Sequence, residues 1–137
     1  MSEVVDQSAR QIVVQFLDEW DTLGFEGAYG NHLHPDCVWR NTGSPDRVGM
    51  DDIMDGLAEY NRVFDRPYCK VEITNMASEG DLVFVERWED LYSKDRDDRF
   101  RTKNLSFFRI KNGKIIEWND YFDYVPYSDG RALPKNR

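Results

Sequence analysis

The feature that most constrains the fold is a change in the spacing of apolar residues at Pro67. Before Pro67 the apolar residues recur every three or four positions, as along one face of a helix; after it they alternate, as in a strand. The alternating half contains an Asn-Gly pair at positions 112–113, which favours a tight turn between two antiparallel strands. Helices followed by an antiparallel meander predict an α+β fold.

Each half divides into elements at glycine, proline and polar turn residues. Three helices are predicted, over Ser8–Leu23, Phe25–Leu33 and Asp51–Phe64. Five strands are predicted, over Cys37–Asn41, Tyr68–Met76, Leu82–Tyr92, Phe100–Ile110 and Ile115–Tyr124. Gly24 is expected to stop the first helix, Pro35 to end the second, and Asp51 to cap the third. The segment Thr42–Gly49 is expected to be a loop.

Length and charge limit the possible functions. The chain has 137 residues, which suits one domain over residues 1–137 whose core needs neither disulfides nor a structural metal. The net charge of −8 argues against a nucleic-acid or anionic-membrane partner, because phosphate contacts need clustered cations. The one basic cluster, Arg96–Lys103, is interrupted by Asp97 and Asp98 and is expected to be a solvated hairpin.

The cysteines and histidines do not predict a metal or redox site. Cys37 and Cys69 have neither metal-binding nor redox spacing. His32 and His34 lack an acidic partner at a suitable spacing, and are expected to interact with the end of the short helix or with solvent. No apolar run approaches the roughly 18 residues of a membrane span, and Met1–Gln11 is polar, so the expected location is the cytoplasm.

Charged residues stand in the middle of otherwise apolar strand faces. Side chains alternate across a strand, so Arg87 and Glu89 share a face. The faces predicted to point inward carry Val83, Val85, Arg87, Glu89 and Leu91 in one strand, Phe100, Thr102, Asn104, Ser106 and Phe108 in the next, and Ile116, Trp118, Asp120 and Phe122 in the last. An uncompensated buried charge is costly, and the planar Arg87 guanidinium can bond Glu89 and Asp120 at once. The pattern fits a structural ion-pair network as well as a reactive site.

Three segments carry a resemblance to a known family. The run Val85–Glu89, the tripeptide from Trp39 to Asn41 and the run Gly113–Asp123 resemble limonene-1,2-epoxide hydrolases and their relatives in the SnoaL-like, nuclear-transport-factor-two-like superfamily. That family carries Arg-x-Asp on one strand, Tyr-x-Asn on an early strand and Trp-x-Asp-Tyr-Phe-Asp on the last. The resemblance covers nearly the whole chain. It implies a cone in which three N-terminal helices pack on a strongly curved, mainly antiparallel sheet around a pocket.

The resemblance also implies a reaction, in which water adds to an epoxide in one step without metal, cofactor or covalent intermediate. By position, Asp120 is the base that takes a proton from the water, and Asn41 and Trp39 help to hold that water. Glu89, kept protonated, gives a proton to the epoxide oxygen, and Arg87 bridges the two acids. Two carboxyl groups in one water-poor site are driven to different protonation states, which suits these roles.

Two residues depart from the family pattern and keep alternatives open. Glu89 replaces Asp and is longer by one methylene, whereas Trp39 replaces Tyr and can donate a hydrogen bond but not accept one. One alternative is a SnoaL-like polyketide cyclase or a ketosteroid-isomerase-like enzyme. It would use Asp120 as base, with Asn104, Tyr60 or Trp39 as donor to an enolate oxygen. The other alternative is a non-catalytic ligand-binding protein.

The expected substrate pocket is lined from the third helix and the inward strand faces. The expected lining residues are Tyr60, Phe64, Leu91, Thr102, Asn104, Trp118 and Phe122. Thr102 and Asn104 stand where the family tends to place aliphatic groups. They indicate either a substrate with hydroxyl or carbonyl oxygens or an ordinary buried water network. The expected ligand is therefore an apolar small molecule with some oxygen function.

The opposite face of the sheet carries more large apolar groups than open water favours. They are Phe84, Trp88, Tyr92, Leu105 and Phe107. Such a face is expected to pack on the same face of a second subunit, which predicts a homodimer. Asp123 has the opposite parity to Asp120 and is expected at the surface or at this interface.

Overall fold

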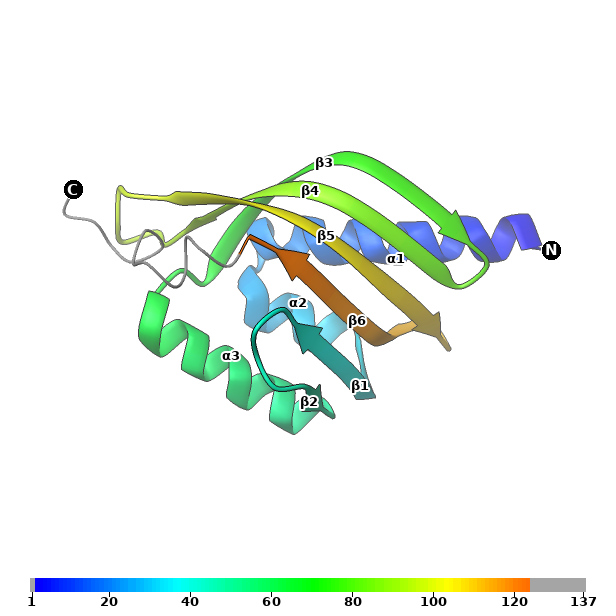
Figure 1. Ribbon diagram of the computed structural model, residues 1–137, viewed down its shortest axis with the longest axis horizontal. Helices are drawn as coiled ribbons and strands as arrows, with labels where there is room; N and C mark the ends of the chain where they lie inside the picture. The colour runs from blue at the N-terminus through cyan, green and yellow to red at the C-terminus, as the bar shows by residue number, and fades with distance from the viewer. Residues whose placement is uncertain (1, 124–137) are drawn as a thin grey trace.

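The computed structural model describes residues 2–123, with side chains from residue 9 onward. Its helices are α1 (Ser2–Thr22), α2 (Gly24–His32) and α3 (Met50–Phe64). Its strands are β1 (Leu33–Asn41), β2 (Arg47–Val48), β3 (Tyr68–Glu79), β4 (Leu82–Tyr92), β5 (Phe100–Lys111) and β6 (Lys114–Phe122). The helices pack on one mixed sheet that is curled but not closed (Figure 1). The predicted α+β class is confirmed.

The order of the strands places an early strand of the chain beside the last one. The sheet runs β2-β1-β6-β5-β4-β3, and its neighbours are antiparallel except for the parallel pair β1 and β6. In this pair Trp39 lies opposite Trp118, and Asn41 lies opposite Asp120. Two segments of the resemblance that are far apart in the sequence are therefore neighbours in the sheet.

Several boundaries differ from the prediction. Helix α1 begins at Ser2 rather than Ser8, and β3 continues to Glu79 rather than ending at Met76. The predicted loop contains the short strand β2, which pairs antiparallel with β1. The pattern missed this strand because two residues are too few to show an alternation.

Pro35 lies inside β1 instead of marking only the end of a helix. Proline has no N–H to donate to a sheet ladder, so it is tolerated where the ladder is interrupted. The pairing of β1 with β6 shifts its register between Leu33 and Val38. Pro35 falls within this shift, which explains why the strand can pass through it.

Asp51 does not cap α3, contrary to the prediction. The residue before this helix is Gly49, with φ of 87°, and no side chain caps the helix. Asp51 is exposed in the first turn, while the carboxylate of Asp52 accepts the backbone N–H of Val48 at 2.9 Å. The positive φ of Gly49 turns the chain so that the second acidic residue, not the first, faces β2.

A bulge in β6 changes which residue points inward at the start of the strand, so the prediction for Ile116 is wrong. Ile110 pairs with Ile115 whereas Arg109 pairs with Glu117, so Ile116 is an extra residue in β6. A bulge reverses the parity of the residues before it. Ile115, not Ile116, is therefore the fully buried residue at the start of the strand. The hairpin before it is as predicted, since positions 112 and 113 have φ of 53° and 77° and form a tight turn.

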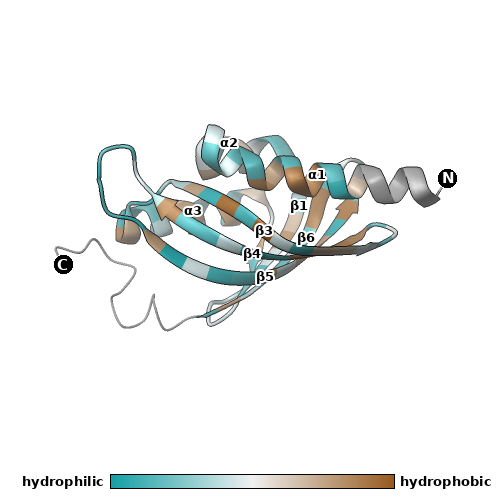
Figure 2. Cartoon of the chain, turned by 90° about the horizontal axis from the view of Figure 1, so that it is seen from above, coloured by the Kyte–Doolittle hydropathy of each residue, from teal (hydrophilic) through white to brown (hydrophobic). Residues whose placement is uncertain are grey.

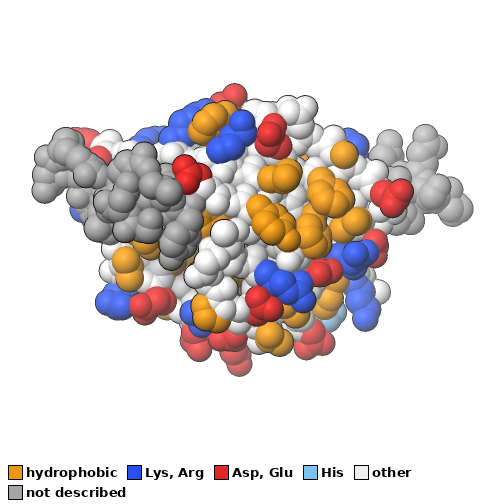
Figure 3. Space-filling view, viewed as in Figure 1, with side chains coloured by type: hydrophobic (Ala, Val, Ile, Leu, Met, Phe, Trp, Pro, Cys, Tyr) orange, Lys and Arg blue, Asp and Glu red, His pale blue; other side chains and the backbone are white. Residues whose placement is uncertain are grey.

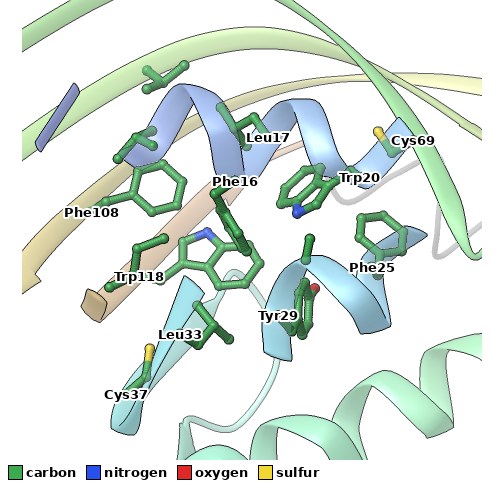
Figure 4. Close-up of a cluster of buried hydrophobic side chains, with 14 of the residues drawn as sticks. Phe16, Leu17, Trp20, Phe25, Tyr29, Leu33, Cys37, Cys69, Phe108 and Trp118 are labelled. Atoms are coloured by element: carbon green, nitrogen blue, oxygen red, sulfur yellow. The ribbon is translucent and has the colours of Figure 1, made fainter. Parts of the chain in front are cut away.

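The hydrophobic core lies between α1, α2 and the face of the sheet that these helices cover, here called the inner face (Figure 2). Phe16 stands at its centre. Its ring centroid is 5.3 Å from those of Trp20 and Trp118 and 6.1 Å from that of Phe108, all in edge-to-face geometry (Figure 4). This packing holds Trp118 in one position. Within residues 2–123, no helix is long and apolar enough to cross a membrane.

Candidate active site

The inner face of β4 carries the residues that its alternation predicts. Alternate positions from Val83 to Leu91 are buried, so Arg87 and Glu89 both point inward. The register then sets their neighbours. Arg87 lies opposite Asn104 of β5. Ser106, two residues further along β5, lies opposite Asp120 of β6. Asp120 in turn lies opposite Asn41 of β1.

Arg87 is fully buried and bridges the two acids. Its Nε donates to Oε2 of Glu89 at 2.9 Å, and its Nη2 forms an ion pair with the same oxygen at 2.8 Å. Its Nη1 donates to Oγ of Ser106 at 2.8 Å, and its Nη2 lies 3.5 Å from Oδ1 of Asp120. The indole of Trp20 covers the guanidinium at 5.4 Å. The arginine is thus bonded tightly to Glu89 and reaches Asp120 mainly through Ser106.

Asp120 accepts hydrogen bonds from donors on four different side chains. Its Oδ1 accepts from the Ser106 hydroxyl, from Trp118 Nε1 at 2.6 Å and from Arg87 at 3.5 Å. Its Oδ2 accepts from Trp39 Nε1 at 3.2 Å. Every one of these partners donates, so the ionised carboxylate satisfies all of them. Among the described residues, Oδ2 has this one hydrogen-bond partner.

Two stacked indoles hold the Asp120 carboxylate from both sides. The rings of Trp39 and Trp118 are 4.6 Å apart and nearly parallel, at 15°. Their N–H groups donate to different oxygens of Asp120, which fixes the plane of the carboxylate. Tyr29 of α2 packs edge-on against both rings, at 5.8 and 5.4 Å. The orientation of the acid is therefore set by aromatic packing as well as by hydrogen bonds.

The cluster contains one cation and two acids, so it is neutral when one acid holds a proton. Burial raises the pKa of Glu89; the neighbouring Arg87 opposes this rise, and the Asp120 carboxylate adds to it. Although burial favours the neutral guanidine, Glu89 and Asp120 raise the pKa of Arg87, so it stays charged. Glu89 is the acid that favours the proton, and Asp120 is the one surrounded by donors.

A cavity of about 290 Å³ opens onto this cluster. Its lining combines aromatic rings with a few polar groups. The lining residues are Trp20, Phe25, Tyr29, Trp39, Asn41, Ser44, Pro45, Arg47, Gly56, Leu57, Glu59, Tyr60, Phe64, Glu89, Leu91, Asn104, Trp118, Asp120 and Phe122. Of the predicted catalytic set, Trp39, Asn41, Glu89 and Asp120 line the cavity, whereas Arg87 lies behind its wall.

The observed cavity differs from the predicted pocket at one residue, Thr102. The other six predicted lining residues are on the cavity wall, but Thr102 is not. It is buried opposite Glu89 in the neighbouring strand, and its hydroxyl has no hydrogen-bond partner within the described part of the chain.

Several functional neighbours were missing from the predicted set. Ser106, which joins Arg87 to Asp120, lay on the predicted polar strand face, so its parity was a usable signal. Trp20 was part of an amphipathic helical pattern that indicated only core packing. Tyr29 had no sequence signal, because the short helix α2 is buried along much of its length and shows no clear polar face.

The histidines take roles outside the cavity. His32 is buried and its Nε2 lies 2.9 Å from Oε2 of Glu19, so it pairs with α1 and not with its own helix end or solvent as predicted. His34 Nδ1 accepts the backbone N–H of Asp36 at 3.0 Å. In residues 2–123, no group of three or more His, Cys, Asp or Glu side chains is placed to hold a metal ion.

Comparison with known proteins gives one family match and several similar structures. The sequence profile of the SnoaL-like domain matches residues 13–118. A candidate SnoaL-like polyketide cyclase from Jannaschia sp. CCS1 is 15% identical, with a TM-score of 0.74 over 96% of each chain. An LEH-like epoxide hydrolase from M. tuberculosis is 23% identical, with a TM-score of 0.72 over 93% of this chain and 90% of that one.

A third similar structure is described by a ketosteroid isomerase-like fold. A protein from Catenulispora acidiphila with a ketosteroid isomerase-like fold, solved in complex with trimethylamine, is 19% identical. Its TM-score is 0.69 over 90% of this chain and 93% of that one. At these identities the likeness establishes a shared fold alone.

Proposed function

Since this chain belongs to the SnoaL-like domain family, we propose that it is a small-molecule hydrolase that adds water to an epoxide in one step. One observation carries the proposal: two buried carboxyl groups share Arg87 but differ in their surroundings. Burial raises the pKa of Glu89, whereas the carboxylate of Asp120 is held by donors. One acid and one base facing the same cavity are what concerted epoxide opening requires. The name of the M. tuberculosis relative is consistent with this reaction.

The reaction balances without a further reactant. Oδ2 of Asp120 takes a proton from a water molecule as the water oxygen bonds to an epoxide carbon. The bond from that carbon to the epoxide oxygen breaks, and Glu89 gives its proton to this oxygen. The product is a diol, with one water molecule consumed. A proton then passes from Asp120 to Glu89, directly or through solvent, and restores the starting state.

Asn41 and Trp39 have separate tasks in this scheme. Asn41 lines the cavity opposite Asp120 on the neighbouring strand, so its amide can hold the attacking water. The N–H of Trp39 is donated to Oδ2 of Asp120 and orients the base, because an indole has no acceptor for a water proton. The longer side chain of Glu89 still accepts the N–H of Arg87 Nε and pairs with its Nη2, so the replacement of Asp keeps the bridge.

The pair of acids favours hydrolysis over proton transfer next to a carbonyl, because an isomerase or cyclase needs only one carboxylate as base. An isomerase or cyclase would need a free donor for an enolate oxygen. The hydroxyl of Tyr60 donates to the carbonyl oxygen of Arg66 at 3.1 Å, and the N–H of Trp39 is used by Asp120. Of the three donors considered, Asn104 is the one whose side chain has no hydrogen-bond partner within the described residues, and it lines the cavity. A protein that only binds a ligand would not need two acids in such different surroundings.

We also propose that the chain forms a homodimer through the outer face of the sheet. Phe84, Leu105 and Tyr121 are 40%, 47% and 55% exposed. Leu105 and Tyr121 lie opposite each other on β5 and β6, and Phe84 packs against Phe107 at 5.6 Å. Figure 3 shows a group of hydrophobic side chains on the face of the molecule where β4, β5 and β6 lie. An apolar patch of this kind supports a self-complementary interface.

The test of the hydrolase is diol formation in isotopically labelled water. Styrene oxide and limonene oxide should each give a diol that contains one labelled oxygen. Asp120→Asn should abolish the reaction, because an amide cannot take the proton from water. Asp123→Asn is the matched control, since Asp123 is exposed just beyond β6. If the folded wild type converts no member of an epoxide panel, the proposal is wrong.

A further inference from the structure

Two polar side chains on the cavity wall are not used by the proposed chemistry. Tyr29 comes from α2 and Asn104 from β5, and both line the cavity. They are 2% and 3% exposed. Neither side chain has a hydrogen-bond partner within residues 2–123. Since both line the cavity, their donors are suited to a hydrogen-bond partner that enters with a ligand.

Tyr29 stands beside the acid and the base. Its ring packs edge-on against Trp39 and Trp118, the two indoles that donate to Asp120. Burial raises the pKa of Tyr29 well above its ordinary value, and the Asp120 and Glu89 carboxylates add to the rise. The hydroxyl therefore keeps its proton and acts as a hydrogen-bond donor.

Asn104 lies in the row of the sheet between the two acids. It is opposite Arg87 on one side and opposite Phe122 on the other. The next inward residue along β5 in one direction is Ser106, which bonds Asp120, and in the other it is Thr102, which lies opposite Glu89. A ligand atom between the acid and the base is therefore within reach of the Asn104 amide, which carries two N–H donors.

We propose that the substrate is an epoxide with a carbonyl group next to the epoxide ring, and that Tyr29 and Asn104 bind the carbonyl oxygen. A carbonyl oxygen has two lone pairs and can accept from both donors. The rest of the wall is largely aromatic, with Phe25, Trp118 and Phe122, and suits an apolar carbon ring. Water adds across the epoxide as before and the carbonyl is unchanged. The proposal rests on the hydrolase function for the part that Asp120 and Glu89 play.

A matched pair of epoxides tests this preference. Cyclohexene oxide and the epoxide of cyclohexenone share a ring, and only the second has a carbonyl oxygen. Once each kcat/KM is divided by the uncatalysed hydrolysis rate of the same compound, the wild type should favour the ketone about tenfold or more. Tyr29→Phe and Asn104→Leu should each reduce this ratio about tenfold. Tyr121→Phe, on the outer face, should leave it unchanged. Equal normalised rates in the wild type would overturn the proposal.

A binding measurement separates this proposal from the hydrolase itself. Trp20, Trp39 and Trp118 line the cavity, so ligand binding should change tryptophan fluorescence. The probes are decalone and decalin, which share a carbon skeleton and carry no epoxide. Tighter binding of decalone, lost in Asn104→Leu, supports the carbonyl site even if no epoxide is converted, and the hydrolase function alone then fails. Equal binding of the two probes overturns the carbonyl site whatever the hydrolysis assay gives.

Discussion

Glu89 and Asp120 are both acidic side chains on the inner face, but the structure places them in different surroundings. Glu89 meets one cation, whereas Asp120 meets a hydroxyl, two indoles and a more distant guanidinium. Buried charge is stabilised by donors and opposed by other charge of the same sign. The proposed division of labour between acid and base therefore rests on contacts that differ by single residues.

The pH dependence of turnover follows from Glu89. Burial raises its pKa, and the reaction needs its protonated form. Activity should therefore be lost as the pH rises through the folded-state pKa of Glu89. Glu89→Gln should slow turnover by about 10²–10⁴-fold and remove this loss from the residual activity. The measurement is kcat/KM against pH.

Glu86→Gln is the control for this profile. Glu86 lies on the outer face of the same strand and bonds Thr74 and Asn75. Its variant should keep the wild-type fall in activity at high pH. If the Glu89 variant keeps that fall as well, Glu89 is not the acid.

Ser106 joins Arg87 to Asp120, and its removal should weaken the fold. Ser106→Ala leaves Nη1 of Arg87 and Oδ1 of Asp120 each without one partner in a buried site. The expected loss in the free energy of unfolding is about 1–3 kcal/mol. Urea denaturation measures it. Ser44→Ala, at an exposed position, should change the free energy by much less; a similar loss in both variants would contradict the role of Ser106.

At the level of elements, the hairpin between β5 and β6 sets the position of Asp120. Gly113 has φ of 77°, a conformation that costs an L-residue roughly 1–2 kcal/mol. Gly113→Ala should therefore destabilise the fold by about 1 kcal/mol. The matched control is Gly30→Ala in α2, where an added Cβ meets nothing within 4 Å. That change should stabilise by up to about 1 kcal/mol, since alanine favours a helix. Opposite signs in urea denaturation are the expected result.

The parallel pair of β1 and β6 is the element-level feature that completes the candidate site. It brings Trp39 to one oxygen of Asp120 and Asn41 to the cavity wall. A parallel pair needs a long crossover connection, and here the crossover contains α3 and strands β2 to β5. The side of the site proposed to hold water therefore depends on pairing between distant segments and not on local pattern.

For the whole molecule, the outer face predicts self-association. The wild type should sediment as a dimer at micromolar concentration. Leu105→Lys should give a folded monomer, because it places a charge in the centre of the apolar patch. Leu23→Lys is the control, since Leu23 is 51% exposed at the junction of α1 and α2, away from the sheet face. A monomeric wild type would contradict the interface.

Part of the predicted outer face takes another role. The ring of Trp88 is covered by Arg101 and Lys103, at 4.8 and 4.5 Å. The hydroxyl of Tyr92 donates to Asp21 of α1, and its ring stacks on Tyr68. Trp88 and Tyr92 therefore make their contacts within the same chain and are not part of the proposed dimer interface. The apolar patch is centred on β5 and β6 instead.

The sequence by itself determined five of the six described strands, the hairpin and the inward direction of Arg87, Glu89 and Asp120, because alternation and turn preference are local properties of the chain. It could not show that Ile116 is a bulge residue, since a bulge is defined only by the partner strand. Only the tertiary structure decided that Trp39 donates to Asp120 across 81 positions and that Tyr29 faces the same cavity. Such contacts depend on which distant segments pack together, and packing is a property of the whole fold.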